Sequence, residues 1–321
     1  MIRAAAMLLL LAQPVAARDI LLGLPVACDM AQTCFLQNYM DRDPGPGAAD
    51  FTCAPQSYDG HDGVDFALPD EVMMAAGVDV LAAAPGTVKA TRDGMADALQ
   101  GVPGAPDITD QECGNGLVID HGGGWETQYC HMKQGSVVVQ PGLHVAMGQR
   151  LGQVGLSGQT EFPHLHLTVR HDGVAVDPFH PDDTLTCGTP PDHTLWLQPL
   201  PYGPGGMIAA GFATEVPEFA AIKAGLPSPA ALPGTAPALV LWAELYGGRK
   251  GDSVTLTITS PTGPLLTEDI ILVKPQARLF RAVGKRLTTQ SWPPGTYIGT
   301  AIFTRDGKEL DRQSARLTIG P

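Results

Sequence analysis

The chain has 321 residues, of which 44% are apolar, and it contains 38 glycines and 29 prolines. This composition is typical of a globular protein with many turns, and it argues against long helices. Acidic residues outnumber basic ones by 33 to 20, so the chain lacks the basic surplus of proteins that bind nucleic acid or anionic lipid. The length allows about two domains, and we expect a mainly β fold.

Residues 1–17 predict a secretory signal peptide. One arginine precedes an apolar run that ends in Val15, Ala16 and Ala17, a small-residue cleavage site, and this run is too short to span a membrane. No later stretch approaches the roughly 18 continuous apolar residues of a transmembrane helix. We therefore expect an exported protein without a transmembrane segment, located in the periplasm or, failing that, outside the cell.

Residues 18–55 form a turn-rich segment that carries half of the cysteines. The six cysteines are Cys28, Cys34, Cys53, Cys113, Cys130 and Cys187. An even number of cysteines in an oxidising compartment favours disulfides, and the absence of any C-x-x-C pair argues against a cysteine-ligated zinc site. We expect Cys113 to pair with Cys130, because these two flank a predicted strand at 116–121 and its neighbour. The other four cysteines remain open to several pairings.

Residues 56–187 contain short β-type runs separated by glycine and predict an antiparallel β-sheet domain. The runs are VDVLAAA, GTVKAT, GLVIDH, WETQYCHM, SVVVQ, QRLGQVG and HLHLTVR. Residues 188–236 are rich in proline and glycine and predict a linker, interrupted by one short helix at PEFAAIKAGL.

Residues 237–321 lack cysteine and predict a C-terminal β-sandwich of the immunoglobulin-like kind, with six or seven short strands. In the run DSVTLTITS, for example, Val254, Leu256 and Ile258 fall on one face of a strand. Four aromatic residues in this region suit a sandwich core better than a sugar-binding platform: Trp242, Tyr246, Trp292 and Tyr297.

The run PHLHL places His164 and His166 on the same face of a predicted strand. The apolar residues Leu165, Leu167 and Val169 then lie on the opposite face, which we expect to be the core. An H-x-H pair is also compatible with a half-buried strand whose outer face is merely polar. The pair therefore needs partners elsewhere in the chain to indicate a site.

Two further patterns supply such partners. His61 and Asp65 occur at the spacing H-x-x-x-D, and the run TQYCHM carries Tyr129 and His131, which strand alternation places on one face. Asp62, between the first two, is expected to be solvated. Each pattern alone is weak, and their occurrence together and in order is more informative.

In this order the motifs resemble those of the lysostaphin-like zinc metalloendopeptidases, which cut peptides of bacterial cell walls. The resemblance covers about residues 58–180. Its motifs are HDGVDF at 61–66, Asn115-Gly116, YCHM at 129–132, GLSG at 155–158, HLH at 164–166, Asp172-Gly173 and Asp177-Pro178. In one departure, Cys130 stands where a small residue is common. In the other, Glu161-Phe162-Pro163 replaces a more usual small-residue approach to the histidine pair.

The resemblance implies that residues 56–187 form a zinc metallopeptidase domain with a substrate groove. It implies His61, Asp65 and His166 as ligands of Zn²⁺, and His131 and His164 as catalytic residues. Two imidazoles and one carboxylate suit zinc and leave a fourth position for water, which is the pattern of a catalytic site. The His-Glu-x-x-His signature is absent, so the two remaining histidines are the candidates for accepting a proton and stabilising an oxyanion, in either assignment.

The sequence thus predicts an exported zinc endopeptidase that acts on the peptide stems or cross-links of peptidoglycan. The alternative is a catalytically inactive regulator of a cell-wall hydrolase that binds through the same groove. Loss of a ligand or a catalytic histidine would mark that alternative, and all five positions are filled. A purely structural metal would require a fourth protein ligand, and the sequence offers no obvious one. The C-terminal domain is a candidate docking site for a cell-wall protein partner.

Overall fold

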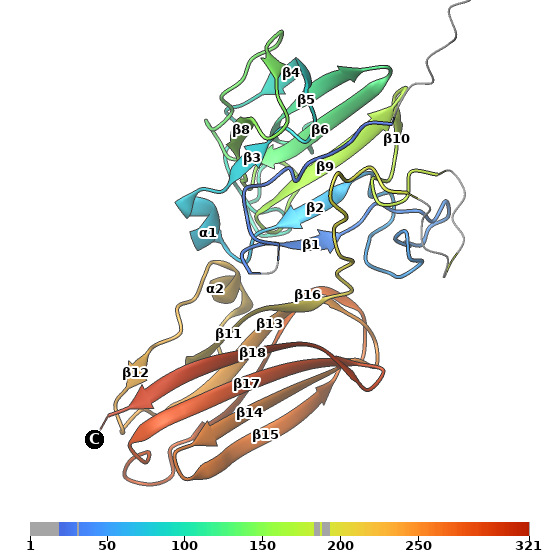
Figure 1. The fold of residues 1–321 in the computed structure, drawn as a ribbon. Coiled ribbons are helices and arrows are strands. Elements are labelled where there is room, and N and C mark those ends of the chain that lie inside the picture. The colour runs from blue at the N-terminus through green and yellow to red at the C-terminus, as the bar shows by residue number, and fades with distance from the viewer. Residues whose placement is uncertain (1–18, 31, 183–186, 188–192, 321) are drawn as a thin grey trace, which may run out of the picture.

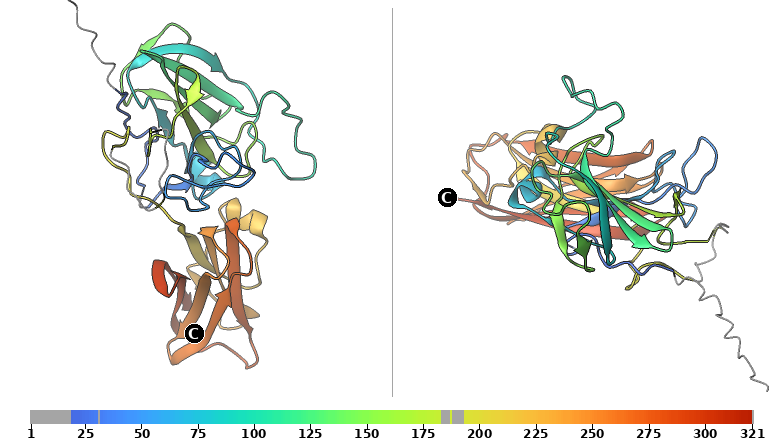
Figure 2. Two further views of the ribbon diagram at one scale, coloured as in Figure 1. Left: turned by 90° about the vertical axis from the view of Figure 1, so that its right-hand side faces the viewer. Right: turned by 90° about the horizontal axis from the view of Figure 1, so that it is seen from above.

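The computed structural model describes residues 19–30, 32–182, 187 and 193–320. The predicted signal peptide lies outside the described residues. As expected, the protein is mainly β, with antiparallel sheets and only short helices in the described part (Figure 1). The strands form two units, one with a core drawn from Ile20 to Trp196 and one with a core drawn from Met207 to Ile319 (Figures 1 and 2).

The N-terminal unit is built on an eight-stranded sheet in the order β1-β2-β9-β6-β5-β4-β7, with β10 paired to β9. A small second sheet pairs β3 with β8. The strands are β1 Phe35–Asn38, β2 Val64–Ala67, β3 Asp79–Leu81, β4 Gly86–Arg92, β5 Asn115–Gly122, β6 Trp125–Met132, β7 His144–Val145, β8 Arg150–Gln153, β9 His164–His171 and β10 Val174–Ala175.

Strand β9 lies in the middle of this sheet and alternates as expected. Leu165, Leu167 and Val169 are buried in the core, while the opposite face carries the two histidines of the H-x-H pair. The pairing partner on one side is β2, where Asp65 lies opposite His166. On the other side Cys130 of β6 lies opposite the same histidine. One sheet face is thus anchored in the core, and the other can carry a site.

Two local features of this unit differ from the expected strands. Residues 136–140, expected as a strand, are irregular, because Val137 donates its N–H to the Asp93 carboxylate and Val138 donates to Leu151. Helix α1, Glu71–Ala76, was not expected. It has no buried residue and is held by its caps, since Asp70 accepts a hydrogen bond from the Met73 N–H.

Residues 19–55 are integrated into the N-terminal unit. Strand β1 pairs with β2 and so becomes the strand next to the one that carries Asp65. All six cysteines are paired, as Cys28–Cys34, Cys53–Cys187 and Cys113–Cys130, and the last of these pairs confirms the expectation from the sequence.

The C-terminal unit consists of a three-stranded sheet, β11-β13-β16, and a five-stranded sheet, β12-β18-β17-β14-β15, which share one core. Val254, Leu256 and Ile258 are fully buried in that core, as expected, and Trp292 and Tyr297 belong to it too. Trp242 and Tyr246 are buried but lie outside this core, contrary to expectation, because they alternate with the core residues Leu241, Ala243 and Leu245 along β13. The elements are β11 Gly206–Ala213, α2 Phe219–Lys223, β12 Ala231–Leu232, β13 Ala238–Gly248, β14 Ser253–Ser260, β15 Gly263–Ile271, β16 Gln276–Arg286, β17 Gly295–Arg305 and β18 Lys308–Ile319.

Strand β11 lies inside the stretch expected to be a linker. It pairs with β13 because its apolar residues Met207 and Phe212 are buried in the C-terminal core. The short helix expected within PEFAAIKAGL is present as α2. Within the described part of the chain, no helix is long and apolar enough to cross a membrane.

Candidate metal centre

The structure brings the five residues singled out in the sequence together at one end of the central strands. His61 lies in the loop before β2, and Asp65 lies in β2 itself. His131 is in β6, and His164 and His166 are in β9. All five side chains are buried, with 2 to 8% of their surface exposed. The cluster is therefore assembled from three segments that are far apart in sequence.

Three donor atoms of this cluster form a compact triangle. His61 Nε2 lies 3.1 Å from Asp65 Oδ1 and 3.1 Å from His166 Nδ1, and His166 Nδ1 lies 3.0 Å from Asp65 Oδ1. Atoms spaced in this way share points about 2 Å from each of them, the length of Zn–N and Zn–O bonds. Two nitrogens and one carboxylate oxygen also match the donor set of catalytic zinc sites, so these residues fit a zinc ion.

A second layer of contacts orients the three candidate ligands. His61 donates from Nδ1 to the backbone oxygen of Tyr39 at 2.7 Å, which leaves Nε2 free to bind a metal. Asp65 accepts at Oδ2 a hydrogen bond of 2.8 Å from the side chain of Asn38, which leaves Oδ1 facing the two histidines. The N-terminal segment thus holds two of the three ligands in place.

His166 is oriented at its other ring nitrogen. Its Nε2 lies 3.0 Å from the hydroxyl of Thr168 and 3.2 Å from the carboxylate of Asp62. The Asp62 side chain is half exposed, and the hydrogen bond with His166 lowers its pKa to about 2 despite partial burial. Asp62 is thus solvated, as expected, and in addition it contacts His166, because the H-D-G turn brings its side chain to β9.

Gly63 makes this arrangement sterically possible. A Cβ atom at this position would lie 2.6 Å from His166 Nε2 and 2.6 Å from the backbone oxygen of Leu167. Such contacts are too short for any side chain, so the loop can approach β9 only because residue 63 is glycine.

His131 and His164 stand beside the triangle, with ring centroids 4.6 Å apart. Each is held through Nδ1 by a backbone oxygen, that of Ser157 at 2.8 Å for His131 and that of Phe162 at 3.0 Å for His164. In a neutral ring held this way, Nδ1 carries the proton and Nε2 can accept one. The His164 Nε2 lies 3.5 Å from Asp65 Oδ1.

His131 reaches the cluster through a bulge. Strand alternation placed it on the same face as Tyr129, but the pairing of β5 with β6 shifts register between Asn115 and Leu117, and His131 has a φ of 62°. The bulge turns His131 toward the histidines of β9. Tyr129 points into the core, where its hydroxyl accepts a hydrogen bond of 2.8 Å from the Ala83 N–H. Its role is therefore packing, and it does not line the site.

Residues 59–178 match the family model described as peptidase family M23. This stretch is similar to that family and is referred to below as the M23 domain. This finding confirms the resemblance seen in the sequence.

The M23 domain also aligns with curated relatives. It is 32% identical over 106 residues, 33% of this chain, to the peptidoglycan DD-endopeptidase ShyA of Vibrio cholerae, and covers 19% of that protein. It is 32% identical over 120 residues, 37% of this chain, to the DD-carboxypeptidase/endopeptidase Mpg of Neisseria meningitidis, and covers 22% of that protein. The chain thus aligns with about a fifth of the length of each relative. A solved zinc-containing peptidase of Vibrio cholerae is similar with 25% identity and a TM-score of 0.34, over 50% of this chain and 39% of that one.

The charges in the M23 site are strongly coupled. Burial opposes ionisation of Asp65, but the neighbouring His61, His164 and His166 outweigh it and hold the pKa of the carboxyl well below its usual range. Burial lowers the pKa of His131 and of His164, and the nearby histidines add to the effect for His131. Both rings are therefore neutral near pH 7 and able to accept a proton.

His166 behaves in the opposite way. Burial works against its protonation, but Asp62 and Asp65 together raise its pKa to about 9. A metal ion at Nδ1 has to displace this proton, so metal binding at the site competes with protons.

A cavity of about 350 Å³ lies over β4, β5 and β6, beside the strands that carry the candidate site. Gln128 of β6 lines this cavity and pairs with Thr168, which contacts His166. Val118 of β5 pairs with Gln128 and lines it too. Paired residues share one face of a sheet, so the cavity lies along the same face as the five site residues.

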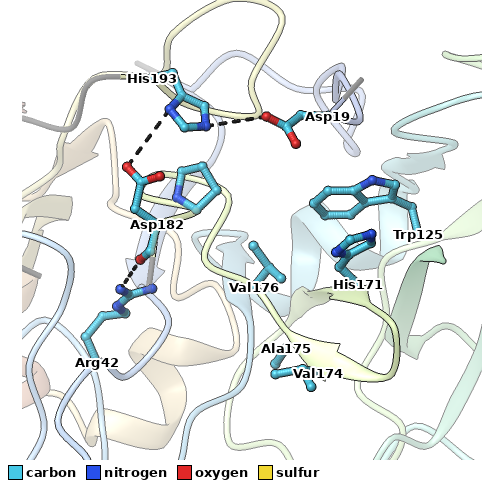
Figure 3. Close-up of a pocket in the computed structure, with 10 residues that line it drawn as sticks. Asp19, Arg42, Trp125, His171, Val174, Ala175, Val176, Asp182 and His193 are labelled. Atoms are coloured by element: carbon cyan, nitrogen blue, oxygen red, sulfur yellow. Dashed lines mark hydrogen bonds and ion pairs between the residues drawn. The ribbon is translucent and has the colours of Figure 1, made fainter. Parts of the chain in front are cut away.

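A separate cavity of about 400 Å³ lies at the opposite end of β6 and β9 (Figure 3). There the rings of Trp125 and His171 stack at 4.4 Å, and His193 lies between Asp19 and Asp182 (Figure 3). None of the five candidate site residues lines this cavity.

Proposed function

We propose that the protein is an exported, zinc-dependent endopeptidase that hydrolyses peptide bonds in the stems or cross-links of peptidoglycan. The observation that carries this proposal is the meeting of three zinc-compatible donor atoms with two histidines whose Nδ1 atoms are held by backbone oxygens, so that Nε2 is the remaining ring nitrogen of each. The relatives ShyA and Mpg, described as a peptidoglycan DD-endopeptidase and a DD-carboxypeptidase/endopeptidase, support the choice of substrate.

His61 Nε2, Asp65 Oδ1 and His166 Nδ1 would hold the metal. When bound there, zinc would lower the pKa of a coordinated water and polarise the scissile carbonyl. Because the pKa of Asp65 is held well below its usual range, its carboxylate is ionised at neutral pH. Oδ1 can then bind the metal while Oδ2 accepts the hydrogen bond from Asn38. No fourth protein donor joins the described cluster, which leaves room for water and substrate.

His131 and His164 would handle the proton and the developing negative charge. Their Nδ1 atoms are committed to the backbone oxygens of Ser157 and Phe162, so only Nε2 can act on the substrate. One of the two neutral rings accepts the proton of the attacking water and later delivers it to the leaving amine. The other ring, once protonated or through a bridging water, hydrogen-bonds the oxyanion.

The proposal includes export to the periplasm, which the sequence of residues 1–17 and the three disulfides support. For the C-terminal unit we propose an immunoglobulin-like β-sandwich, supported by two sheets that share one core.

The test is hydrolysis of isolated peptidoglycan sacculi by the purified mature protein, with released fragments identified by mass spectrometry. We expect release that a chelator abolishes and that added zinc restores, and no release by the variant His131→Ala. His144→Ala is the matched control, because His144 is exposed and distant from the cluster. Release that survives chelation contradicts the metal mechanism. A protein that binds sacculi but releases nothing under any condition is the regulator instead.

A further inference from the structure

The approach to the histidine pair, Glu161-Phe162-Pro163, departs from the usual small residues, and the structure shows what the larger residue contacts. The Phe162 ring stacks on the His164 ring, with centroids 4.4 Å apart and planes inclined by 25°. The Phe162 backbone oxygen accepts from His164 Nδ1 at 3.0 Å and from the Thr160 hydroxyl at 2.6 Å. Phe162 therefore contacts the His164 ring both through its own ring and at Nδ1, where the Thr160 hydroxyl also lies at 3.0 Å.

The Phe162 ring also contacts the C-terminal unit. The guanidinium carbon of Arg278, near the start of β16, lies over the Phe162 ring at 5.7 Å from its centroid. Cations placed over an aromatic face are attracted to it, and more strongly where water is excluded. The Arg278 side chain is only 7% exposed, so this contact lies in such a place.

Arg278 is itself fixed by two strong contacts. Its Nε donates to the carboxylate of Glu244 on the neighbouring strand β13 at 2.9 Å, and its Nη2 donates to the backbone oxygen of Pro69 in the N-terminal unit. Its Nη1 is buried and has no hydrogen-bond partner among the described residues, so the ring of Phe162 is the remaining electrostatic partner of this cation. The guanidinium thus belongs to the C-terminal sheet and rests on the M23 domain.

Additional contacts hold the two units together around this point. Phe35 of β1 stacks on Tyr246 of β13 with centroids 4.4 Å apart, and Gln37 donates to the backbone oxygen of Ala277 at 3.5 Å. Lys223 of α2 lies 3.5 Å from the backbone oxygen of Glu161, next to Phe162 (Figure 1 shows α2 and β16 facing the N-terminal unit). The loop before β9 is therefore held from the C-terminal unit at two places.

We propose that Arg278 is a positioning residue of the M23 active site, through which the C-terminal domain fixes Phe162 and thereby the catalytic ring of His164. This inference rests on the proposed peptidase function. It assigns the C-terminal domain an indirect part in catalysis, in addition to any role in partner binding.

The variant must remove the cation without leaving a buried charge. Arg278→Ala alone would leave the Glu244 carboxylate, whose side chain is 1% exposed, buried without its cationic partner. Loss of one partner of a buried ion pair can unfold a domain. The double variant Arg278→Met with Glu244→Gln removes both charges at similar volume. Arg278→Lys keeps a cation, and Phe162→Leu removes the ring while keeping its backbone oxygen. Arg281→Ala is the matched control, because both hydrogen bonds of Arg281 stay within β16.

On a purified cross-linked muropeptide we expect kcat to fall about tenfold in the double variant and in Phe162→Leu, with KM and zinc content unchanged. Arg278→Lys should retain an intermediate kcat, and Arg281→Ala should match the wild type. Combining Phe162→Leu with the double variant should cause no further loss, because both act through one contact. An unchanged kcat in the double variant, additive losses, or an equal loss in Arg281→Ala would overturn the proposal.

A second measurement needs no turnover. Diethyl pyrocarbonate labels exposed imidazoles, and peptide mapping by mass spectrometry gives the rate for His164, which is 4% exposed in the intact structure. We expect labelling of His164 to become at least threefold faster in the double variant and to stay unchanged in Arg281→Ala. If the wild type cleaves no muropeptide, the proposed function fails, and faster labelling still supports the positioning of His164. Unchanged labelling overturns the inference in either case.

Discussion

Asn38 and Asp65 are joined by a hydrogen bond of 2.8 Å between the Asn38 amide nitrogen and Asp65 Oδ2. Asn38 ends β1 and Asp65 lies opposite it in β2, so the contact follows from the register of these two strands. Because both side chains are buried, no water can replace the amide if it is lost. The free Oδ2 would then compete for the positions that Oδ1 and the histidines occupy.

We therefore expect Asn38→Ala to weaken zinc binding by about 10- to 100-fold, the usual effect of losing an outer partner of a ligand. Titration against a competing chelator measures this change. Thr52→Ala is a control from the same N-terminal segment, since Thr52 contacts Asp50 and not the cluster. Equal zinc affinity in Asn38→Ala and wild type would show that Asn38 does not orient Asp65.

Gly63→Ala should displace His166 and abolish zinc binding. The added Cβ would lie 2.6 Å from His166 Nε2 and 2.6 Å from a backbone oxygen of β9, and neither atom can retreat without moving the central strand. The measurement is zinc content after dialysis, together with circular dichroism. Gly320→Ala is the matched control, because a Cβ there meets nothing within 4 Å. A Gly63→Ala protein with full zinc content would contradict the close approach of this loop to β9.

The two histidines beside the triangle should be needed for turnover and not for metal binding. We expect His131→Ala and His164→Ala each to lower kcat by about 10²- to 10⁴-fold, the range for loss of a general acid or base, while zinc content stays at the wild-type level. The double variant should be little worse than either single one, because the residues act on the same step. Loss of zinc in either single variant would instead make that histidine a ligand.

Part of the candidate site could be predicted from the sequence because side chains alternate regularly along β9. His164 and His166 share a face, with Leu165 and Leu167 buried behind them, as the alternation indicated. Alternation failed at His131, because a bulge with a positive φ reverses the direction of the side chain, and no residue type at that position signals it.

The residues that contact the candidate site from outside could not be predicted from the sequence, for a different reason. Asn38 lies 27 residues before Asp65, and Arg278 belongs to a separate unit, so both meet the site only through tertiary packing. Strand β11 was missed because small residues and nearby prolines made its surroundings look like a linker, although Phe212 is fully buried. The local sequence pattern therefore indicated the candidate ligands, whereas strand register and packing between the two units bring together the residues that contact them.

The disulfide between Cys113 and Cys130 should stabilise the site as well as the fold. Cys130 lies opposite His166 and precedes the bulge at His131, whose N–H donates to the backbone oxygen of Cys113 at 2.8 Å. A cross-link over 17 residues is worth about 3 kcal/mol in the chain-entropy account.

We expect the variant with both cysteines changed to serine to unfold at a lower denaturant concentration and to have a lower kcat. A control variant of Cys28 and Cys34 should lose stability without losing kcat, because Cys34 directly precedes β1, which β2 and β9 separate from β6 in the sheet. Equal kcat in the two variants would show that the disulfide does not stabilise the bulge at His131.

Asp177 should make the protein less stable as the pH rises. It is fully buried, its Oδ2 has no hydrogen-bond partner in the described part of the chain, and burial raises its pKa to about 7 against the hydrogen bonds from Phe179 and His180 and the charge of Arg42. The folded protein thus holds a proton that the unfolded chain releases near pH 4, so the stabilisation is full below about pH 4 and is lost as the pH rises to about 7. The loss across this range is about 4 kcal/mol.

Asp177→Asn keeps an acceptor for the Phe179 N–H, which Asp177 Oδ1 binds at 2.9 Å, and cannot ionise. Urea unfolding at pH 5 and pH 8 should therefore show a smaller decrease in unfolding free energy for Asp177→Asn than for the wild type, and an identical decrease in both would place the pH dependence elsewhere.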